Sequence, residues 1–152
     1  MKTLKAGDPA PAFSGRDQAG NTVTLDSLRG KRVILYFYPK DNTPGCTAEA
    51  CSLRDGKAEL ERMGFTIIGV SPDSEKSHTG FIAKHNLNFP LIADTDHKIA
   101  DDYGVWGEKK LAGRSYMGIR RTTFVIDAEG IIEKIFDKVD TARHFEQIVD
   151  SY

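Results

Sequence analysis

Residues 33–46 read VILYFYPKDNTPGC, and this stretch joins the pattern of a strand to the start of a helix. The run from Val33 to Tyr38 is continuously β-branched, aliphatic or aromatic and ends at Pro39, which is typical of a strand buried on both faces. Thr43-Pro44 then has the form of an N-cap followed by a first-turn proline. We therefore predict a central strand over 33–38 and a helix that begins just before Cys46.

The expected helix continues to about Met63, because the segment is rich in Ala, Glu, Leu, Arg and Lys and Gly64 is a natural stop. Cys46 then lies in the first helical turn, where unpaired backbone N–H groups and the positive end of the helix dipole favour thiolate over thiol. The alternative is a buried cysteine that acts as a small hydrophobic residue. Helix position alone leaves both interpretations open.

The rest of the chain alternates between strand and helix patterns. A hairpin is expected over 13–17 and 22–25, a buried strand over 66–70, a helix over 75–85, a short extended piece over 89–92, a second strand pair over 122–126 and 131–136, and a final helix over about 142–149. This order predicts an α/β fold, with a mixed central sheet, helices on its faces and an N-terminal β-hairpin. No linker or repeat divides residues 1–152, so we expect one domain.

Charge and composition exclude several classes of partner. The 152 residues carry a formal net charge of -1 with no run of like charge, so neither nucleic acid nor an anionic membrane is indicated. No stretch approaches the roughly 20 apolar residues of a membrane span, and the N-terminus lacks an apolar signal region. We expect a cytoplasmic protein. Two cysteines in a reducing compartment are better interpreted as reactive than as structural.

The surroundings of Cys46 carry a specific resemblance. Residues 38–47 resemble the active-site loop of peroxiredoxins, Pro-x-x-x-Thr-x-x-Cys, and the string through Asp55 resembles the Q-type branch, also called bacterioferritin comigratory protein. The resemblance continues through residues 7–11, 103–109 and 121–127, nearly the whole chain. It implies a thioredoxin-like fold and a thiol peroxidase that reduces hydrogen peroxide or organic hydroperoxides through a Cys46 sulfenic acid.

The same resemblance implies roles for residues around the thiol. Arg121 is the guanidinium expected to stabilise the thiolate and the charge on the peroxide oxygens, with Arg120 as the neighbour that could be mistaken for it. Thr43 is expected to direct its hydroxyl at the thiolate and the peroxide, and Pro39 to shield the site from water. Thr43 has the alternative of a simple helix cap, and Pro39 that of a strand end.

Glu49 lies one turn further along the expected helix. A charge-assisted hydrogen bond from Arg121 to its carboxylate would hold the guanidinium in place. A solvated surface glutamate is the alternative.

Cys51 follows Cys46 by five residues, which on an intact helix rotates it by about 140° and raises it by about 7.5 Å. The Cα atoms would then be roughly 8 to 9 Å apart, beyond the limit of about 7 Å for a disulfide, so bonding requires local unwinding. The resemblance implies that Cys51 resolves the sulfenic acid, with thioredoxin, or alternatively glutaredoxin, as reductant, in a monomeric protein. A packing role for Cys51 remains the alternative.

Two other functions use the same cysteines. A copper chaperone of thioredoxin fold would hold Cu(I) between two thiolates and a distant histidine, but its C-x-x-x-C pattern differs from the C-x-x-x-x-C found here. A general disulfide oxidoreductase would carry C-x-x-C. The spacings of the four histidines match no common zinc site, and we interpret them as surface or local packing residues: His78, His85, His97 and His144. No cofactor or metal is expected.

Overall fold

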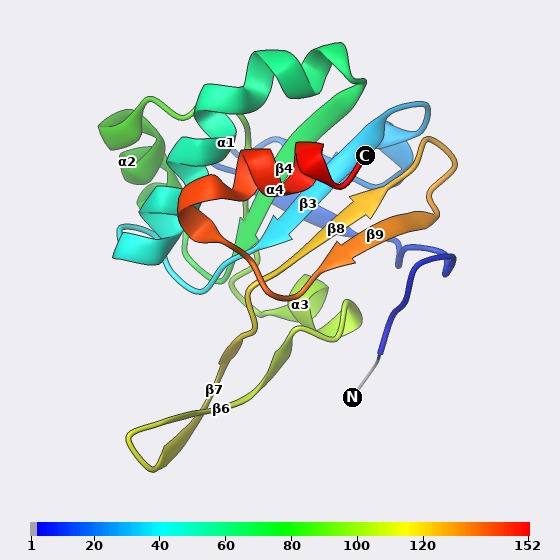
Figure 1. The fold of residues 1–152 in the computed structure, drawn as a ribbon. Coiled ribbons are helices and arrows are strands. Elements are labelled where there is room, and N and C mark those ends of the chain that lie inside the picture. Colours follow the sequence, from blue (N-terminus) through cyan, green and yellow to red (C-terminus); the bar gives the residue numbers. More distant parts are fainter. Residues whose placement is uncertain (1–2) are drawn as a thin grey trace.

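A seven-stranded mixed sheet forms the centre of the computed structural model, which describes residues 3–152 (Figure 1). Its strands are β1 (Ser14–Asp17), β2 (Thr22–Thr24), β3 (Arg32–Phe37), β4 (Phe65–Ser71), β5 (Leu91–Ala93), β8 (Thr122–Ile126) and β9 (Ile132–Phe136). They lie in the order β2-β1-β5-β4-β3-β8-β9. The β3–β4 and β4–β5 pairs are parallel and the other pairs are antiparallel. The middle position belongs to β4, and the strand that we expected to be central, β3, lies beside it.

Strand β3 is buried on both faces, as its continuous apolar sequence predicts. Val33, Leu35 and Phe37 contribute to one apolar cluster of the core. Ile34 and Tyr36 contribute to the cluster on the opposite side of the sheet. The alternation follows from the two-residue period of a strand, so one run of residues supplies both halves of the core.

Helices cover both faces of the sheet, as expected, but unequally. Apolar side chains of α1 (Pro44–Arg62), α2 (Glu75–His85) and α4 (His144–Asp150) belong to one apolar cluster, whereas α3 (Lys98–Asp102) contributes to the other. Figure 1 shows α1, α2 and α4 on one side of the strands and α3 on the other. The described chain also contains two short 3-10 turns, η1 (Asp26–Leu28) and η2 (Thr141–Arg143). The predicted mixed sheet with helices on both faces is thereby confirmed.

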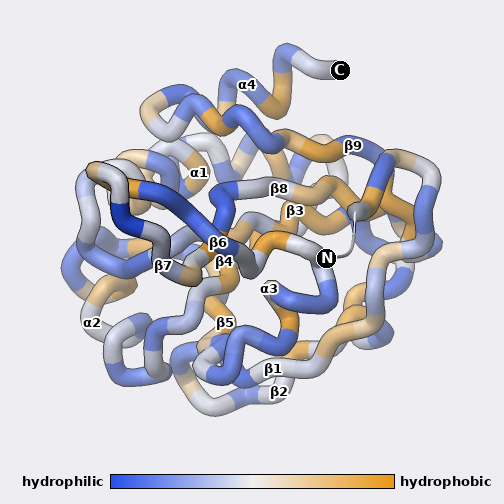
Figure 2. The backbone as a smooth tube through the Cα atoms, turned by 90° about the horizontal axis from the view of Figure 1, so that it is seen from below, coloured by the Kyte–Doolittle hydropathy of each residue, from blue (hydrophilic) through white to orange (hydrophobic). Residues whose placement is uncertain are grey.

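One hairpin was missing from the sequence-based expectations. Strands β6 (Trp106–Leu111) and β7 (Arg114–Ile119) pair only with each other and project away from the main sheet (Figure 1). Hydrophilic, intermediate and hydrophobic residues are mixed along the hairpin (Figure 2), and residues 110–117 are all exposed. Without a buried face, these strands lack the apolar alternation by which a strand is recognised in sequence.

None of the helices within residues 3–152 has both the length and the hydropathy needed to cross a membrane.

Candidate active site

Cys46 lies where the sequence predicts, in the first turn of α1 at the end of β3. Thr43 occupies the N-cap position with extended backbone angles, and Pro44 opens the helix. The thiol side chain is buried, with 1% of the residue exposed. Cys46 is the third residue of α1, so it lies among the first N–H groups, which have no partner within the helix. These groups and the helix dipole favour a negative charge on the sulfur.

Arg121, which follows Cys46 by 75 residues in the sequence, contacts this sulfur. Its Nη2 donates a hydrogen bond to Cys46 Sγ at 3.3 Å. The sheet brings the two residues together because β8 runs antiparallel to β3, which pairs Thr122 with Phe37. The residue before β8 therefore lies beside the loop that follows β3. The described structure thus places the guanidinium of Arg121, rather than that of the exposed Arg120, at the thiol.

Glu49 lies one turn after Cys46 and contacts the same guanidinium. Arg121 Nη1 donates to Glu49 Oε1 at 2.6 Å, and the glutamate side chain is fully buried. A solvated surface position for Glu49 is therefore wrong. Burial raises the pKa of Glu49 to about 7, against the opposing effect of the Arg121 guanidinium. The guanidinium therefore spans two groups, a thiol and a carboxyl, whose negative forms it stabilises.

Behind Glu49 lies a histidine that sequence reasoning did not place. His144 is fully buried, not a surface residue, and its Nε2 lies 3.6 Å from Glu49 Oε2. Its Nδ1 lies 2.9 Å from Gln147 Oε1, an acceptor, so Nδ1 carries the proton and the Thr123 hydroxyl donates to Nε2 at 2.8 Å. Burial lowers the pKa of His144, in agreement with this neutral form. The local sequence did not indicate the contacts with Glu49 and Thr123, because these two residues belong to α1 and β8.

Thr43 and Pro39 lie in the loop before α1. The Thr43 side chain makes no capping bond, and its hydroxyl donates instead to the carbonyl of Lys40 at 2.8 Å. The expectation of a side-chain cap is therefore wrong, although Thr43 does occupy the cap position. Pro39 is half-buried two residues beyond the end of β3. Both residues lie between β3 and α1, just before the helix that contains Cys46.

Cys51 is half-buried, and both cysteines are free thiols. The helix runs without interruption from Pro44 to Arg62, so the two thiols lie on an intact helix. On such a helix the spacing of five residues keeps their Cα atoms too far apart for a disulfide. The described conformation is therefore the one from which a resolving reaction would have to start.

A thiol at a helix N-terminus that accepts a hydrogen bond from an arginine is the kind of site that a thiol-dependent peroxidase uses. Comparisons with known proteins agree. The model of the AhpC/TSA family matches residues 6–135. Peroxiredoxin Bcp of Escherichia coli is 47% identical over 150 residues, which cover 99% of this chain and 96% of that protein. Peroxiredoxin Bcp of Bacillus subtilis is 45% identical over 149 residues, which cover 98% and 95%.

Solved structures that are similar to this chain are also peroxiredoxins. A PrxQ mutant from Xylella fastidiosa has a TM-score of 0.92 at 30% identity and covers 99% of this chain and 96% of its own. Peroxiredoxin Q of Xanthomonas campestris has a TM-score of 0.86 at 36% identity, with 91% and 88% covered. The chain belongs to the AhpC/TSA family, and within that family it is a peroxiredoxin similar to the Bcp and PrxQ proteins.

Proposed function

We propose that Cys46 is the residue that attacks the peroxide. The thiolate sulfur bonds to one peroxide oxygen while the O–O bond breaks, which leaves a Cys46 sulfenic acid and an alkoxide or hydroxide that takes up a proton. The observation that carries this assignment is the 3.3 Å hydrogen bond from Arg121 Nη2 to Cys46 Sγ in the first turn of α1. A cation and a helix N-terminus together stabilise the nucleophile.

Each neighbouring residue has a part in this proposal. Arg121 stabilises the thiolate and the negative charge that develops on the departing oxygen. Glu49 holds the guanidinium through the 2.6 Å bond. The Thr43 hydroxyl donates its hydrogen bond to the Lys40 carbonyl, so its oxygen is the atom that can accept a hydrogen bond from the bound peroxide. Pro39 limits the access of water to the site. No metal or cofactor takes part in these steps.

Cys51 is the resolving thiol in this proposal. Its sulfur attacks the sulfur of the Cys46 sulfenic acid, a disulfide forms, and the hydroxyl leaves as water. Because an intact helix keeps the two cysteines apart, the first turns of α1 unwind before the bond can form.

Recycling requires an external dithiol. We propose thioredoxin as that reductant, with glutaredoxin as the alternative, and a cytoplasmic monomer in which residues 1–152 act as one domain. The substrates are hydrogen peroxide and organic hydroperoxides. Alkyl peroxide reduction is named for the similar bacterioferritin comigratory protein of Xanthomonas campestris, which is 34% identical with a TM-score of 0.89.

A coupled peroxidase assay with thioredoxin and its reductase tests the proposal. Wild-type protein should turn over hydrogen peroxide and an alkyl hydroperoxide, and Cys46→Ser should turn over neither, because a protonated hydroxyl is a far weaker nucleophile. Cys51→Ser should form the sulfenic acid yet lose most thioredoxin-dependent turnover. Normal turnover by Cys46→Ser would refute the assignment of the nucleophile. Normal turnover by Cys51→Ser would make Cys51 a packing residue.

A further inference from the structure

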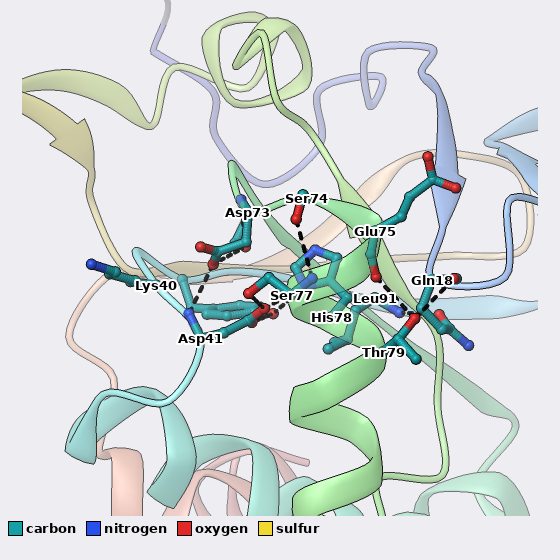
Figure 3. Close-up of polar contacts among 12 residues, drawn as sticks. Gln18, Lys40, Asp41, Asp73, Ser74, Glu75, Ser77, His78, Thr79 and Leu91 are labelled. Carbon is teal, nitrogen blue, oxygen red and sulfur yellow. Dashed lines mark hydrogen bonds and ion pairs between the residues drawn. The ribbon is translucent and has the colours of Figure 1, made fainter.

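Asp41, five residues before Cys46, forms a buried pair with His78 of α2. Asp41 Oδ2 lies 2.8 Å from His78 Nδ1, and the two side chains are 1% and 0% exposed. Figure 3 shows the two side chains pointing toward each other between the loop after β3 and the first turn of α2. Neither residue belongs to the group around Cys46, Arg121 and Glu49. Their burial and short contact therefore require an explanation of their own.

The hydrogen-bond partners define the protonation of this pair. His78 Nε2 lies 2.9 Å from the carbonyl oxygen of Ile92, which can only accept, so Nε2 carries a proton. His78 Nδ1 faces a carboxylate oxygen, which also accepts when ionised. Hydrogen bonds from His78 and Tyr38 lower the pKa of Asp41 despite the opposing effect of burial, so the carboxylate is the ionised partner. Both ring nitrogens of His78 thus face oxygen acceptors, and one of these acceptors is the buried Asp41 carboxylate.

Three further hydrogen bonds attach Asp41 to its surroundings. The Tyr38 hydroxyl donates to Oδ1 at 2.6 Å, and the Ser77 hydroxyl donates to Oδ2 at 2.8 Å. The backbone N–H of Asp41 donates to Asp73 Oδ2 at 2.8 Å. The backbone of Asp41 is thus attached through Asp73 to the segment that connects β4 to α2. The Asp41 carboxylate is attached through Ser77 to the first turn of α2.

The same atoms form a grouping of metal-ligand type, since one ligand atom from each of Asp41, Asp73 and His78 lies within 4.8 Å of the others. Each of these residues is already engaged in hydrogen bonds. Asp73 Oδ2 accepts hydrogen bonds from the backbone N–H of Asp41 and from the Ser71 hydroxyl, and His78 Nδ1 is hydrogen-bonded to Asp41 Oδ2. We therefore interpret the group as a hydrogen-bonded anchor.

We propose that Asp41 and His78 are positioning residues that fix the loop before α1 and thereby hold Thr43 in the geometry needed for peroxide attack. This inference rests on the proposed role of Cys46 as the nucleophile. Thr43 is two residues from Asp41, and the two are separated by Asn42, whose backbone has a positive φ of 63°. A left-handed conformation at a residue other than glycine persists only where its surroundings hold it.

The expected effect is on the reaction with peroxide rather than on the thiol itself. Misplacing reacting groups by about 1 Å can slow a reaction about 100-fold. Cys46 remains in α1 beside Arg121 when the anchor is lost, so its reactivity toward an alkylating reagent, which does not need a bound peroxide, should change little. A role in folding stability alone would not separate these two reactions.

The test compares Asp41→Ala with Asp41→Asn and with a matched control, Asp94→Ala. Asp94 is equally buried, and its carboxylate accepts from the N–H groups of Ile99 and Ala100, away from the loop before α1. The rate constant for Cys46 oxidation by hydrogen peroxide is measured by rapid mixing and mass spectrometry. The rate of Cys46 alkylation by iodoacetamide is measured in parallel.

Asp41→Ala should slow the peroxide reaction about 10- to 100-fold, with alkylation changed by less than about threefold. Asp41→Asn should recover most of the rate, because the amide can donate to a neutral His78 and accept from Tyr38. Asp94→Ala should react with peroxide at the wild-type rate. Equal peroxide rates for Asp41→Ala and Asp94→Ala would overturn the inference, as would a parallel loss of alkylation and peroxide reactivity.

If Asp41→Ala does not fold, Ser77→Ala decides, since it removes a single donor to Asp41 Oδ2. It should slow the peroxide reaction by about threefold, as expected for the loss of one hydrogen bond, and a folded Ser77→Ala with an unchanged rate would overturn the inference. Cys46→Ser separates this outcome from failure of the proposed function. Peroxide reduction by Cys46→Ser refutes the nucleophile, whereas an inactive Cys46→Ser with a normal Asp41→Ala refutes only the anchor.

Discussion

At the scale of single residues, Arg121 connects the two acidic groups of the site through two nitrogens of one guanidinium. Nη1 donates to Glu49 and Nη2 to Cys46. Arg121→Ala should therefore slow formation of the Cys46 sulfenic acid by about 100-fold, the usual cost of removing one donor from developing charge. Rapid-quench measurement of sulfenic acid gives the rate constant.

Arg120→Ala is the matched control for this prediction, because it removes the same charge from the adjacent, exposed position. It should leave the rate constant within about twofold of the wild-type value. If the two variants exchange these behaviours, Arg120 is the functional arginine.

The raised pKa of Glu49 predicts that the free energy of unfolding depends on pH. Its pKa in the folded protein is raised to about 7 from a usual value of 4.5. Between these two values the folded state holds a proton that the unfolded state has lost. This contribution to the free energy of unfolding is complete below about pH 4.5 and declines by roughly 1.4 kcal/mol per pH unit as the pH rises toward 7. Glu49→Gln should remove that slope.

Denaturant unfolding at pH 5, 6 and 7 measures this difference. Glu59→Gln, on the half-exposed surface of α1, is the control and should keep the wild-type slope. A Glu49→Gln variant with the same pH dependence as wild type would show that Glu49 is ionised throughout this range.

Residues of the site were predictable to the extent that they share one short segment. Cys46, Glu49 and Cys51 lie on one helix, so their spacing could be read directly from the sequence. Arg121 required a family resemblance, because 75 residues separate it from the thiol. His144 and His78 are buried packing residues, which is one of the two interpretations that the sequence allowed, and their burial depends on partners that only the folded sheet brings near.

At the scale of elements, α1 carries both cysteines and must change shape if they bond. The part of the helix beyond Cys51 is held by α4. Ser52 Oγ accepts from the backbone N–H of Phe145 at 3.0 Å, and a Cβ at Gly56 would lie 2.1 Å from the Phe145 ring. Unwinding should therefore affect the first turns of α1, while the later turns stay packed against α4.

Hydrogen exchange on reduced and oxidised protein tests this prediction. Peptides from residues 43–56 should exchange faster when Cys46 and Cys51 are bonded, because unwound turns expose backbone N–H groups. Peptides from β3 and β4 serve as the internal control and should be unchanged. Equal protection of 43–56 in both forms, with the bond confirmed by mass spectrometry, would refute unwinding.

Elements with a buried face were predicted closely. The helix expected over 75–85 is α2, and the strand expected over 122–126 is β8. The β6–β7 hairpin and α3 were not predicted. The hairpin has little buried surface to produce a hydrophobic pattern, and α3 has only 5 residues, too few to show a helical period.

At the scale of the molecule, the order of elements predicted a mixed sheet but not which strand lies next to which. The antiparallel pairing of β3 with β8 is the feature that creates the site, because it joins the loop before α1 to Arg121. Strand neighbours depend on pairing between distant segments, which local patterns do not encode. This is why local patterns did not indicate the contact of Arg121 with Cys46, which was expected only from a family resemblance.

The proposed monomer is a prediction for the whole molecule. Sedimentation should give a mass near 16.8 kDa for both redox forms. The largest exposed apolar side chains within residues 3–152 include Leu111 and Met117 on the β6–β7 hairpin, at 68% and 54% exposure. A dimer that dissociates in a Leu111→Ser/Met117→Ser variant would contradict the prediction and place an interface on the hairpin.

The most direct test of the central claim is to locate the first oxidation product. One equivalent of hydrogen peroxide is added to reduced Cys51→Ser protein in the presence of dimedone, and the modified residue is identified by mass spectrometry. Cys46 should carry the adduct of a sulfenic acid, and wild-type protein treated without dimedone should yield a Cys46 to Cys51 disulfide with release of water. An unmodified Cys46 in the Cys51→Ser protein, with peroxide consumed, would contradict the account.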